Sequence, residues 1–431
     1  MLRISVAGLA VGFALASAAM AQDPNADTRS RVRMIREMAK QGSDSVPAIA
    51  TYLGDTDWTV RLEAVKALDD ISGPRTVEPL TRALRDNDPE VQVRATDGVV
   101  NVYLPGYLKT GISGTLQRVG NSVRAKFSDT NDQVIDAYVR VPQDVIEGLG
   151  RVAKGGSSME SRANAARALG ILRGRAAIPE LIEALHSKDN QVMYEGLIAL
   201  QKIGDPSAAP RITFLLRDLE EKVQIAALET TGILRDRGSA REVRDALEHA
   251  RNIKIRRAAV SALGMIADPA DRATFARYLT DKDDALRAAG AEGLGRVNNP
   301  ADRPLLEKAF MDEHNVSPRL SMAFGAALLG NLDTSEFSPY RYLIKGLNLR
   351  TYRNVAIALL TELMRQAPPR QAAYLLMNTA GRDEKTGLAI VLARSGDKDS
   401  LAPLEALSKD TDPEVAQEGI RDLRSLKARL P

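Results

Sequence analysis

One feature restricts the fold of this chain more than any other: a unit of 31 or 32 residues recurs along most of its length. The closing apolar position of the unit returns in steps of 31, 31, 32, 31 and 32 residues, at Leu172, Ile203, Leu234, Ile266, Val297 and Leu329. An upstream pair, Val46 and Val60, recurs 31 residues later at Val77 and Val91. Self-similarity at such a period is typical of solenoids, in which each unit packs on its neighbours.

Each unit predicts two helices. The first half opens near proline, as in the sequence IPEL at 178–181, and the fixed φ of proline suits a first helical turn. The second half follows an Asp-rich turn such as 86–90 (DNDPE), whose carboxylates cap the first amides of a helix. Small and apolar residues then recur at helical spacing, for instance Ala258, Ala259, Ala262, Leu263 and Ile266. One such pair cannot bury both apolar faces, so we expect the units to stack into a continuous core.

The pattern resembles HEAT repeats, in particular the short type named after the phycobilisome lyase subunits. The matching features are the IPEL opening at 178–181, the turn DTDWTVR at 55–61 and the close ALG at 262–264. The resemblance covers nearly all of residues 28–427 and weakens at 104–141 and 331–395. It implies that second helices line a concave face. It implies little about function, since such arrays serve unrelated roles.

The repeats predict an all-α fold, an α-solenoid (α/α superhelix) of about eleven HEAT-like helix pairs. A polar last helix is expected to cap the C-terminal end. The expected organisation is a signal peptide at 1–21, an N-terminal capping half-repeat at 22–42, HEAT-like repeats at 43–103, a divergent insertion at 104–141, HEAT-like repeats at 142–330, divergent HEAT-like repeats at 331–395, and a C-terminal repeat and cap at 396–431.

The first residues have the layout of a secretory signal peptide. One charge, Arg3, precedes an apolar stretch from Ile4 to Ala16, and small residues end in the sequence AMA at 19–21. We expect cleavage after this point and a periplasmic or secreted mature protein, with no integral membrane segment left. The alternative is a retained anchor, because 4–21 carries no charge and is long enough to approach a bilayer span.

The two divergent stretches concentrate aromatic side chains, which make up only 4% of the chain. Tyrosine and arginine dominate interface hot spots, so these stretches are the candidate partner-binding surface. The alternatives are tolerated drift in the insertion and gap-filling by aromatics where the repeats pack irregularly. The candidate partner-binding residues are Tyr103, Tyr107, Lys109, Arg118, Arg124, Lys126, Phe127, Tyr138, Tyr340, Tyr342 and Tyr352.

Two sets of basic residues have structural interpretations. Arg61, Arg94, Arg287 and Arg319 recur at or near one register of the repeat and predict Asp–Arg contacts between adjacent units, the alternative being a ladder of ligand-binding residues. The densest positive run is Arg251, Lys254, Arg256 and Arg257. We expect Glu242, Asp245 and Glu248 on the preceding helix to answer it, the alternative being a site for an anionic partner.

No constellation of residues predicts chemistry. The chain has no cysteine, which excludes disulfides, thiolate metal sites and cysteine nucleophiles. Its three histidines, His186, His249 and His314, are not within helical ligand spacing of one another. The family it resembles includes a di-iron hydroxylase with recurring His-Glu pairs, but this chain has no such dipeptide. We therefore expect no cofactor, no metal and no enzymatic activity.

Three functions compete. The first is an exported, non-catalytic scaffold that binds protein partners through the concave face and the divergent segments. The second, suggested only by the relatives that give the repeat its name, is a lyase-like or ligand-chaperoning enzyme accessory. The third is DNA binding, which the nearly balanced charge disfavours, since 59 Lys and Arg face 56 Asp and Glu. The sequence leaves the partner and the oligomeric state open.

Overall fold

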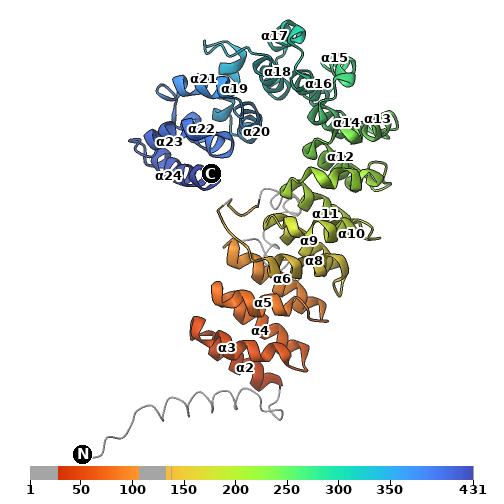
Figure 1. Ribbon diagram of the computed structural model, residues 1–431, viewed down its shortest axis with the longest axis vertical. Coiled ribbons are helices and arrows are strands. Elements are labelled where there is room, and N and C mark those ends of the chain that lie inside the picture. Colours follow the sequence, from red (N-terminus) through yellow and green to blue (C-terminus); the bar gives the residue numbers. More distant parts are fainter. Residues whose placement is uncertain (1–27, 106–132, 137, 431) are drawn as a thin grey trace, which may run out of the picture. The chain divides into compact units, whose positions relative to one another are not determined.

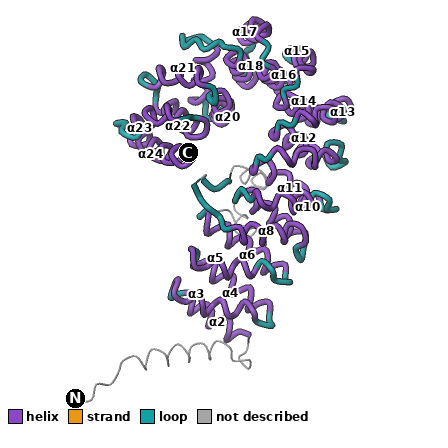
Figure 2. Tube along the Cα trace, viewed as in Figure 1, coloured by secondary structure: helices purple, strands orange, loops and turns teal. Residues whose placement is uncertain are grey.

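The computed structural model describes residues 28–105, 133–136 and 138–430, and every regular element in these ranges is a helix (Figure 2). This confirms the all-α solenoid. The described residues form two compact units, one of residues 28–105, 133–135 and 139–205, the other of residues 136, 138 and 206–430. In the second unit, first helices of successive pairs lie along one side of the row and second helices along the other (Figure 1).

The helices follow the order that the repeat predicts. In the first unit, α2 (Thr28–Ala39) stands alone and is followed by four pairs: α3 (Val46–Thr51) with α4 (Trp58–Ile71), α5 (Val77–Ala83) with α6 (Pro89–Tyr103), α8 (Gln143–Gly155) with α9 (Met159–Ile171), and α10 (Ile178–Ala184) with α11 (Asn190–Ile203).

The second unit begins with the 3-10 helices η6 (Pro206–Arg211) and η7 (Thr213–Leu215), which pair with α12 (Glu221–Leu234). The later pairs are α13 (Ala240–Glu248) with α14 (Ile253–Ile266), α15 (Arg272–Tyr278) with α16 (Asp284–Val297), α17 (Arg303–Asp312) with α18 (Val316–Leu328), α19 (Pro339–Lys345) with α20 (Arg353–Leu363), α21 (Ala367–Met377) with α22 (Arg382–Ser395), and α23 (Leu401–Leu407) with α24 (Pro413–Arg429).

The pair that begins at Pro206 departs from the expected pattern. Its first half was expected to form a short helix near Pro210 but instead forms η6 and η7. Pro210 lies inside η6 and has no backbone N–H to donate to the preceding turn. Pro179 at the equivalent position nevertheless opens the α-helix α10, so the proline alone does not explain the difference. The second helix of the pair, α12, keeps its full length.

The Asp-rich turns cap the second helices, as the sequence indicates. The Asp88 carboxylate accepts hydrogen bonds from the amides of Glu90 and Val91, at 3.0 and 3.1 Å. Asp283 accepts from the amides of Ala285 and Leu286, both at 3.1 Å. Each cap satisfies amides that have no partner inside the helix, which fixes where the second helix begins.

Small residues let successive second helices approach closely. A Cβ added to Gly232 in α12 would lie 2.7 Å from the Cα of Ala262 in α14. One added to Gly295 in α16 would lie 2.6 Å from the Cα of Gly325 in α18. Ala259 and Leu263 are fully buried beside this contact line. The ALG close of the repeat therefore marks where backbones of neighbouring units nearly touch.

Arginines near the start of the second helices form ion pairs between adjacent units, as the repeat predicts. Arg61 binds the Asp86 carboxylate in the next turn at 2.7 and 3.0 Å, and Arg287 binds Glu313 at 2.6 Å. Arg319 departs from the prediction, since its guanidinium lies 4.6 Å from the ring centre of Phe310 and 4.7 Å from that of Tyr342. An aromatic pair takes the place of the expected carboxylate there.

The basic run at 251–257 is paired with other residues than those we expected on α13. Arg251 donates to the carbonyl oxygens of Asp218 and Leu219, which precede α12. Lys254 pairs with Glu221 at 2.8 Å, and Arg257 pairs with Asp283. The partners lie in the turns of the units before and after, because these side chains point along the row of second helices instead of back to α13.

Candidate partner-binding site

Six of the predicted partner-binding residues, Tyr107, Lys109, Arg118, Arg124, Lys126 and Phe127, lie outside the described residues. The other five are divided between the units: Tyr103 belongs to the first, and Tyr138, Tyr340, Tyr342 and Tyr352 belong to the second.

Tyr340 does not belong to a surface. It is fully buried in α19, and its hydroxyl donates to the carbonyl oxygen of Pro369 at 2.5 Å. Burial raises the pKa of Tyr340. The prediction was wrong for this residue because the ring fills the core between α19 and α21, where the alternative of aromatic gap-filling applies.

Tyr342 takes part in a packed aromatic cluster. Its ring meets Phe310 edge to face, with centroids 5.3 Å apart and planes at 73°, and Arg319 stacks on both rings. Burial raises the pKa of the Tyr342 hydroxyl. Tyr352, at the start of α20, is half-buried. Both residues therefore leave only part of their surface for a partner.

Tyr138 is exposed, with 45% of its surface accessible, and its hydroxyl donates to Asp136 at 2.9 Å. This hydrogen bond raises the pKa of Tyr138. The hydrogen bond to Asp136 fixes the hydroxyl of Tyr138, and one face of the ring remains exposed to solvent.

Tyr103 lines a recess of about 580 Å³ in the first unit, which we name the Tyr103 recess. The end of α6 supplies Tyr103 and its neighbour Val102. The first half of the same pair supplies Pro74, Val77 and Glu78. The segment before α8 supplies Arg140 and Pro142, and the first turn of α8 supplies Asp144. The recess lies where the described chain leaves for, and returns from, residues 106–132. Its volume is in the range of small binding sites.

The walls of the Tyr103 recess are apolar and its rim is charged. Val77, Val102 and the Tyr103 ring are half-buried, whereas Glu78, Arg140 and Asp144 are exposed. Burial, and then the charge of Asp144, raises the pKa of Tyr103, so its hydroxyl stays protonated at neutral pH as a hydrogen-bond donor. The site can therefore accept an apolar side chain and orient it by charges of both signs.

Sequence reasoning found Tyr103 but missed its neighbours in the first half of the same pair. The proline that opens η3 (Pro74–Thr76) and Val77 follow the same opening pattern as other first helices, so nothing in the pattern distinguishes them. Arg140 and Pro142 lie at the edge of the predicted insertion. That position, beside a proline that ends the insertion, is the one signal that points to them.

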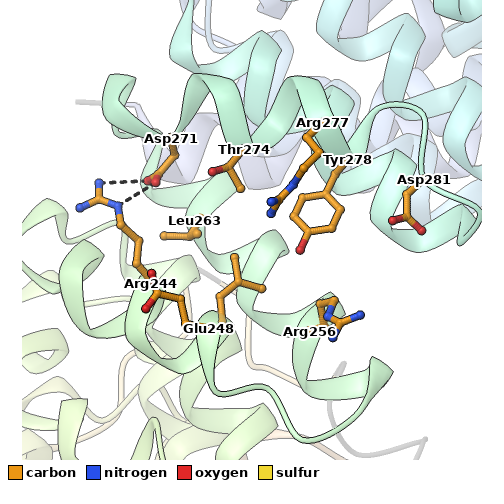
Figure 3. A pocket seen from close by; sticks show the side chains of 10 residues that line it. Arg244, Glu248, Arg256, Leu263, Asp271, Thr274, Arg277, Tyr278 and Asp281 are labelled. Atoms are coloured by element: carbon orange, nitrogen blue, oxygen red, sulfur yellow. Dashed lines mark hydrogen bonds and ion pairs between the residues drawn. The ribbon is translucent and has the colours of Figure 1, made fainter.

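A second recess, of about 600 Å³, is lined by residues of α13, α14 and α15 (Figure 3). Arg244 from α13 crosses to Asp271, with Nε 2.7 Å from the carboxylate, and also binds Asp268. These hydrogen bonds raise the pKa of the Arg244 guanidinium. Arg277 lies with its guanidinium carbon 4.9 Å from the centre of the Tyr278 ring. The Arg244 contacts clamp neighbouring first helices together.

The charges that line this second recess cancel. Three arginines, Arg244, Arg256 and Arg277, face three carboxylates, Glu248, Asp271 and Asp281 (Figure 3). The recess therefore has no net preference for a cation or an anion, and one of its arginines is committed to a structural contact.

Comparison with known proteins identifies the repeat. A family model described as HEAT repeats matches residues 14–98, 146–232 and 240–323, more than half of the chain. The comparison with curated proteins gave no match.

The comparison with solved structures gave matches of low identity and low TM-score. One is an engineered protein, with 19% identity over 89% of this chain and 98% of that chain and a TM-score of 0.40. A second is the complex of CpcE and CpcF of phycocyanin lyase from Nostoc sp. PCC7120, with 19% identity, 64% and 94% coverage and a TM-score of 0.37. A third is human deoxyhypusine hydroxylase in complex with glycerol, with 16% identity, 66% and 96% coverage and a TM-score of 0.28.

Proposed function

Because the chain belongs to the family of HEAT repeats, we propose that it is an exported, non-catalytic scaffold that binds a protein partner at the Tyr103 recess. One observation carries the proposal. At the point where the repeat is interrupted, the first unit presents an open recess that combines an aromatic ring, apolar walls and charges of both signs. Interface hot spots are rich in tyrosine and arginine and lie in pockets, and here a tyrosine forms the wall and an arginine the rim.

The recess favours a particular kind of contact. An apolar side chain of the partner packs between Val77, Val102 and the ring of Tyr103. Basic groups of the partner meet Glu78 and Asp144, and an acidic group meets Arg140. Charges at the rim of an interface affect orientation and association rate more than affinity, so the ring and its walls supply most of the binding energy.

The carboxylates of the repeat turns support a non-catalytic role. Asp57, Asp88, Asp189, Asp283 and Asp412 each accept backbone N–H groups at the start of a second helix. Carboxylates committed to capping are not available as acids or bases. Within residues 28–105, 133–136 and 138–430, no three His, Cys, Asp or Glu side chains are grouped so as to hold a metal ion. We propose no cofactor for this scaffold.

Export is proposed from residues 1–21, which lie outside the described residues. The part of the chain that the structure describes contains no helix that is both long and apolar enough to span a bilayer. A protein partner in the envelope is the expectation that follows from an exported scaffold.

Crosslinking and affinity capture from the native envelope test the proposal. The parent chain is compared with Tyr103→Ala and with Arg140→Ala, which changes an exposed residue. Trp58→Ala is the matched control, since it removes a 46% exposed aromatic from the same unit. A partner lost with Tyr103→Ala or Arg140→Ala and kept with Trp58→Ala supports the proposal. The same partner, captured equally by all four chains, contradicts it.

The insertion is tested by a separate replacement. Removing all of 104–141 would also remove Ile135, which is buried and donates its amide to the carbonyl oxygen of Ile171 at 3.0 Å. A Gly/Ser linker in place of 106–132 alone leaves that contact intact. Loss of the partner with the linker assigns the insertion to the binding surface. A coloured or ligand-loaded preparation without any partner would favour the lyase-like accessory.

A further inference from the structure

A third recess, of about 440 Å³, lies in the second unit and differs from the others in its charge. Four guanidinium groups line it against a single carboxylate: Arg235, Arg237, Arg296, Arg365 and Glu362. Apolar side chains of Met265, Ile266 and Leu328 form the rest of its wall. We name it the arginine recess.

Equivalent positions of three repeats build the recess. Arg235, Ala267 and Asn298 follow α12, α14 and α16, and each takes the left-handed conformation, with φ of 54°, 56° and 59°. A left-handed residue after a helix turns the chain sharply and ends the helix. All three residues line the recess, so its wall repeats with the period of the solenoid.

The only carboxylate of the lining is already paired. Glu362 of α20 lies 2.8 Å from Nη2 of Arg235, and it receives Nε and Nη2 of Arg296 at 3.0 and 3.1 Å. Arg296 also pairs with Glu292 at 2.9 Å, and its side chain is only 7% exposed. Glu362 therefore cannot neutralise a further cation.

Two arginines of the lining keep their charge for a ligand. Arg237 and Arg365 are exposed, and among the described residues no carboxylate lies within ion-pair distance of either guanidinium. Arg237 attracts Asp268 only at longer range, and the Asp268 carboxylate is bound by Arg244. A guanidinium offers a planar fork of N–H donors that matches a carboxylate or a phosphate. Cations gathered in a concave site with low-dielectric walls raise the local concentration of anions.

We propose that the arginine recess binds a small organic anion. Its carboxylate or phosphate group is held by Arg237 and Arg365, and its carbon skeleton lies against Met265, Ile266 and Leu328. The paired Arg235, Arg296 and Glu362 form a fixed floor that ties α12, α16 and α20 together. The recess of Figure 3 has a similar volume but balanced charge, so it lacks this preference. This inference concerns the second unit and does not depend on partner binding at Tyr103.

Isothermal titration calorimetry of the mature chain tests the inference. The probes are succinate and inorganic phosphate, titrated at ionic strength matched with sodium chloride. Saturable binding at one site is expected, weakened at least tenfold in the double variant Arg237→Gln/Arg365→Gln. The matched control is Arg256→Gln/Arg277→Gln, which removes two exposed guanidinium groups from the recess of Figure 3 and should leave the affinity unchanged.

The outcomes show whether an anion binds in the arginine recess and, if it does, which class of anion it is. Tighter succinate identifies an organic acid, and tighter phosphate identifies a phosphate ester. Equal affinity of the parent and the Arg237/Arg365 double variant overturns the inference, as does the absence of saturable binding of both probes. All four substituted arginines are exposed, and circular dichroism confirms that each double variant is folded.

Discussion

Arg296 and Glu362 form a two-pronged ion pair across 66 positions of sequence, with Nε 3.0 Å from Oε1 and Nη2 3.1 Å from Oε2. The arginine lies in the last turn of α16, and the glutamate lies in α20, two helix pairs further along. Arg296 also stacks over the Phe324 ring of α18 at 5.2 Å. Burial alone would raise the pKa of Glu362, but the charges and hydrogen bonds of Arg296 and Arg235 outweigh it and lower that pKa.

Glu362→Gln should destabilise the second unit. The substitution removes one of the two carboxylates that pair with the nearly buried Arg296, while Glu292 remains, and it also removes the ion pair of Arg235. We expect a loss of about 1–3 kcal/mol of unfolding free energy, less than for an ion pair broken completely. Glu336→Gln is the control, because Glu336 pairs with Lys345 at the surface, where water screens the charges, and its loss should have little effect on stability. Urea denaturation measures both. Equal effects would show that the remaining ion pair with Glu292 is enough to stabilise Arg296.

Ala259→Asp should unfold the units around α14. Ala259 is fully buried between second helices, so the new carboxylate has neither water nor a cation to stabilise it. A loss of about 3 kcal/mol or more is expected. Ala273→Asp places the same side chain on the exposed face of α15 and should have little effect. Thermal unfolding followed by circular dichroism distinguishes them, and an unchanged midpoint for Ala259→Asp would mean that the core register is wrong.

Gly295→Ala should destabilise the chain although alanine favours helix. The added Cβ would lie 2.6 Å from the Cα of Gly325, so α16 and α18 must move apart, at a cost of about 1–3 kcal/mol. Gly155→Ala, at the end of α8, meets no atom within 4 Å and should be neutral or stabilising by up to ~1 kcal/mol. Chemical denaturation should show a lower free energy of unfolding for Gly295→Ala and an equal or higher one for Gly155→Ala. A free energy of unfolding that does not fall in Gly295→Ala would contradict the close approach of α16 and α18.

Asp422 should make the stability of the folded chain fall as the pH rises. Burial and then the neighbouring charge of Glu418 raise its pKa from 3.8 to about 7. Between these values the folded state binds a proton that the unfolded state has released, so raising the pH destabilises the fold. Asp422→Asn removes the effect and should stabilise the chain at pH 8 by roughly 1–3 kcal/mol, with little change at pH 4.

Urea denaturation at both pH values checks this expectation. Glu418→Gln should act in the same direction, because it removes the like charge beside Asp422 in α24. Parallel pH profiles for the parent and Asp422→Asn would contradict it. The arginines Arg421 and Arg394 oppose the shift and are present in every variant, so they do not affect the comparison.

The repeat in the sequence predicted the helix order, the Asp caps and the close approach of second helices. Each of these depends on residues within one unit or its neighbour, such as Asp88 and Val91 or Gly232 and Ala262. The same reasoning failed at two places. The first half of the pair that begins at Pro206 forms 3-10 helices, and an aromatic pair replaces the carboxylate expected opposite Arg319.

The sequence by itself therefore determined the fold, because helix periodicity, capping and nearest-neighbour packing are all local. Only the tertiary structure decided that Tyr340 lies in the core, that Pro74 and Val77 join Tyr103 around one recess, and that Glu362 meets both Arg235 and Arg296. The contacts of Glu362 join units that are two and four pairs apart. These contacts depend on the small rotation of each unit relative to the next, which accumulates over several units. The sequence of a single unit does not specify the accumulated rotation.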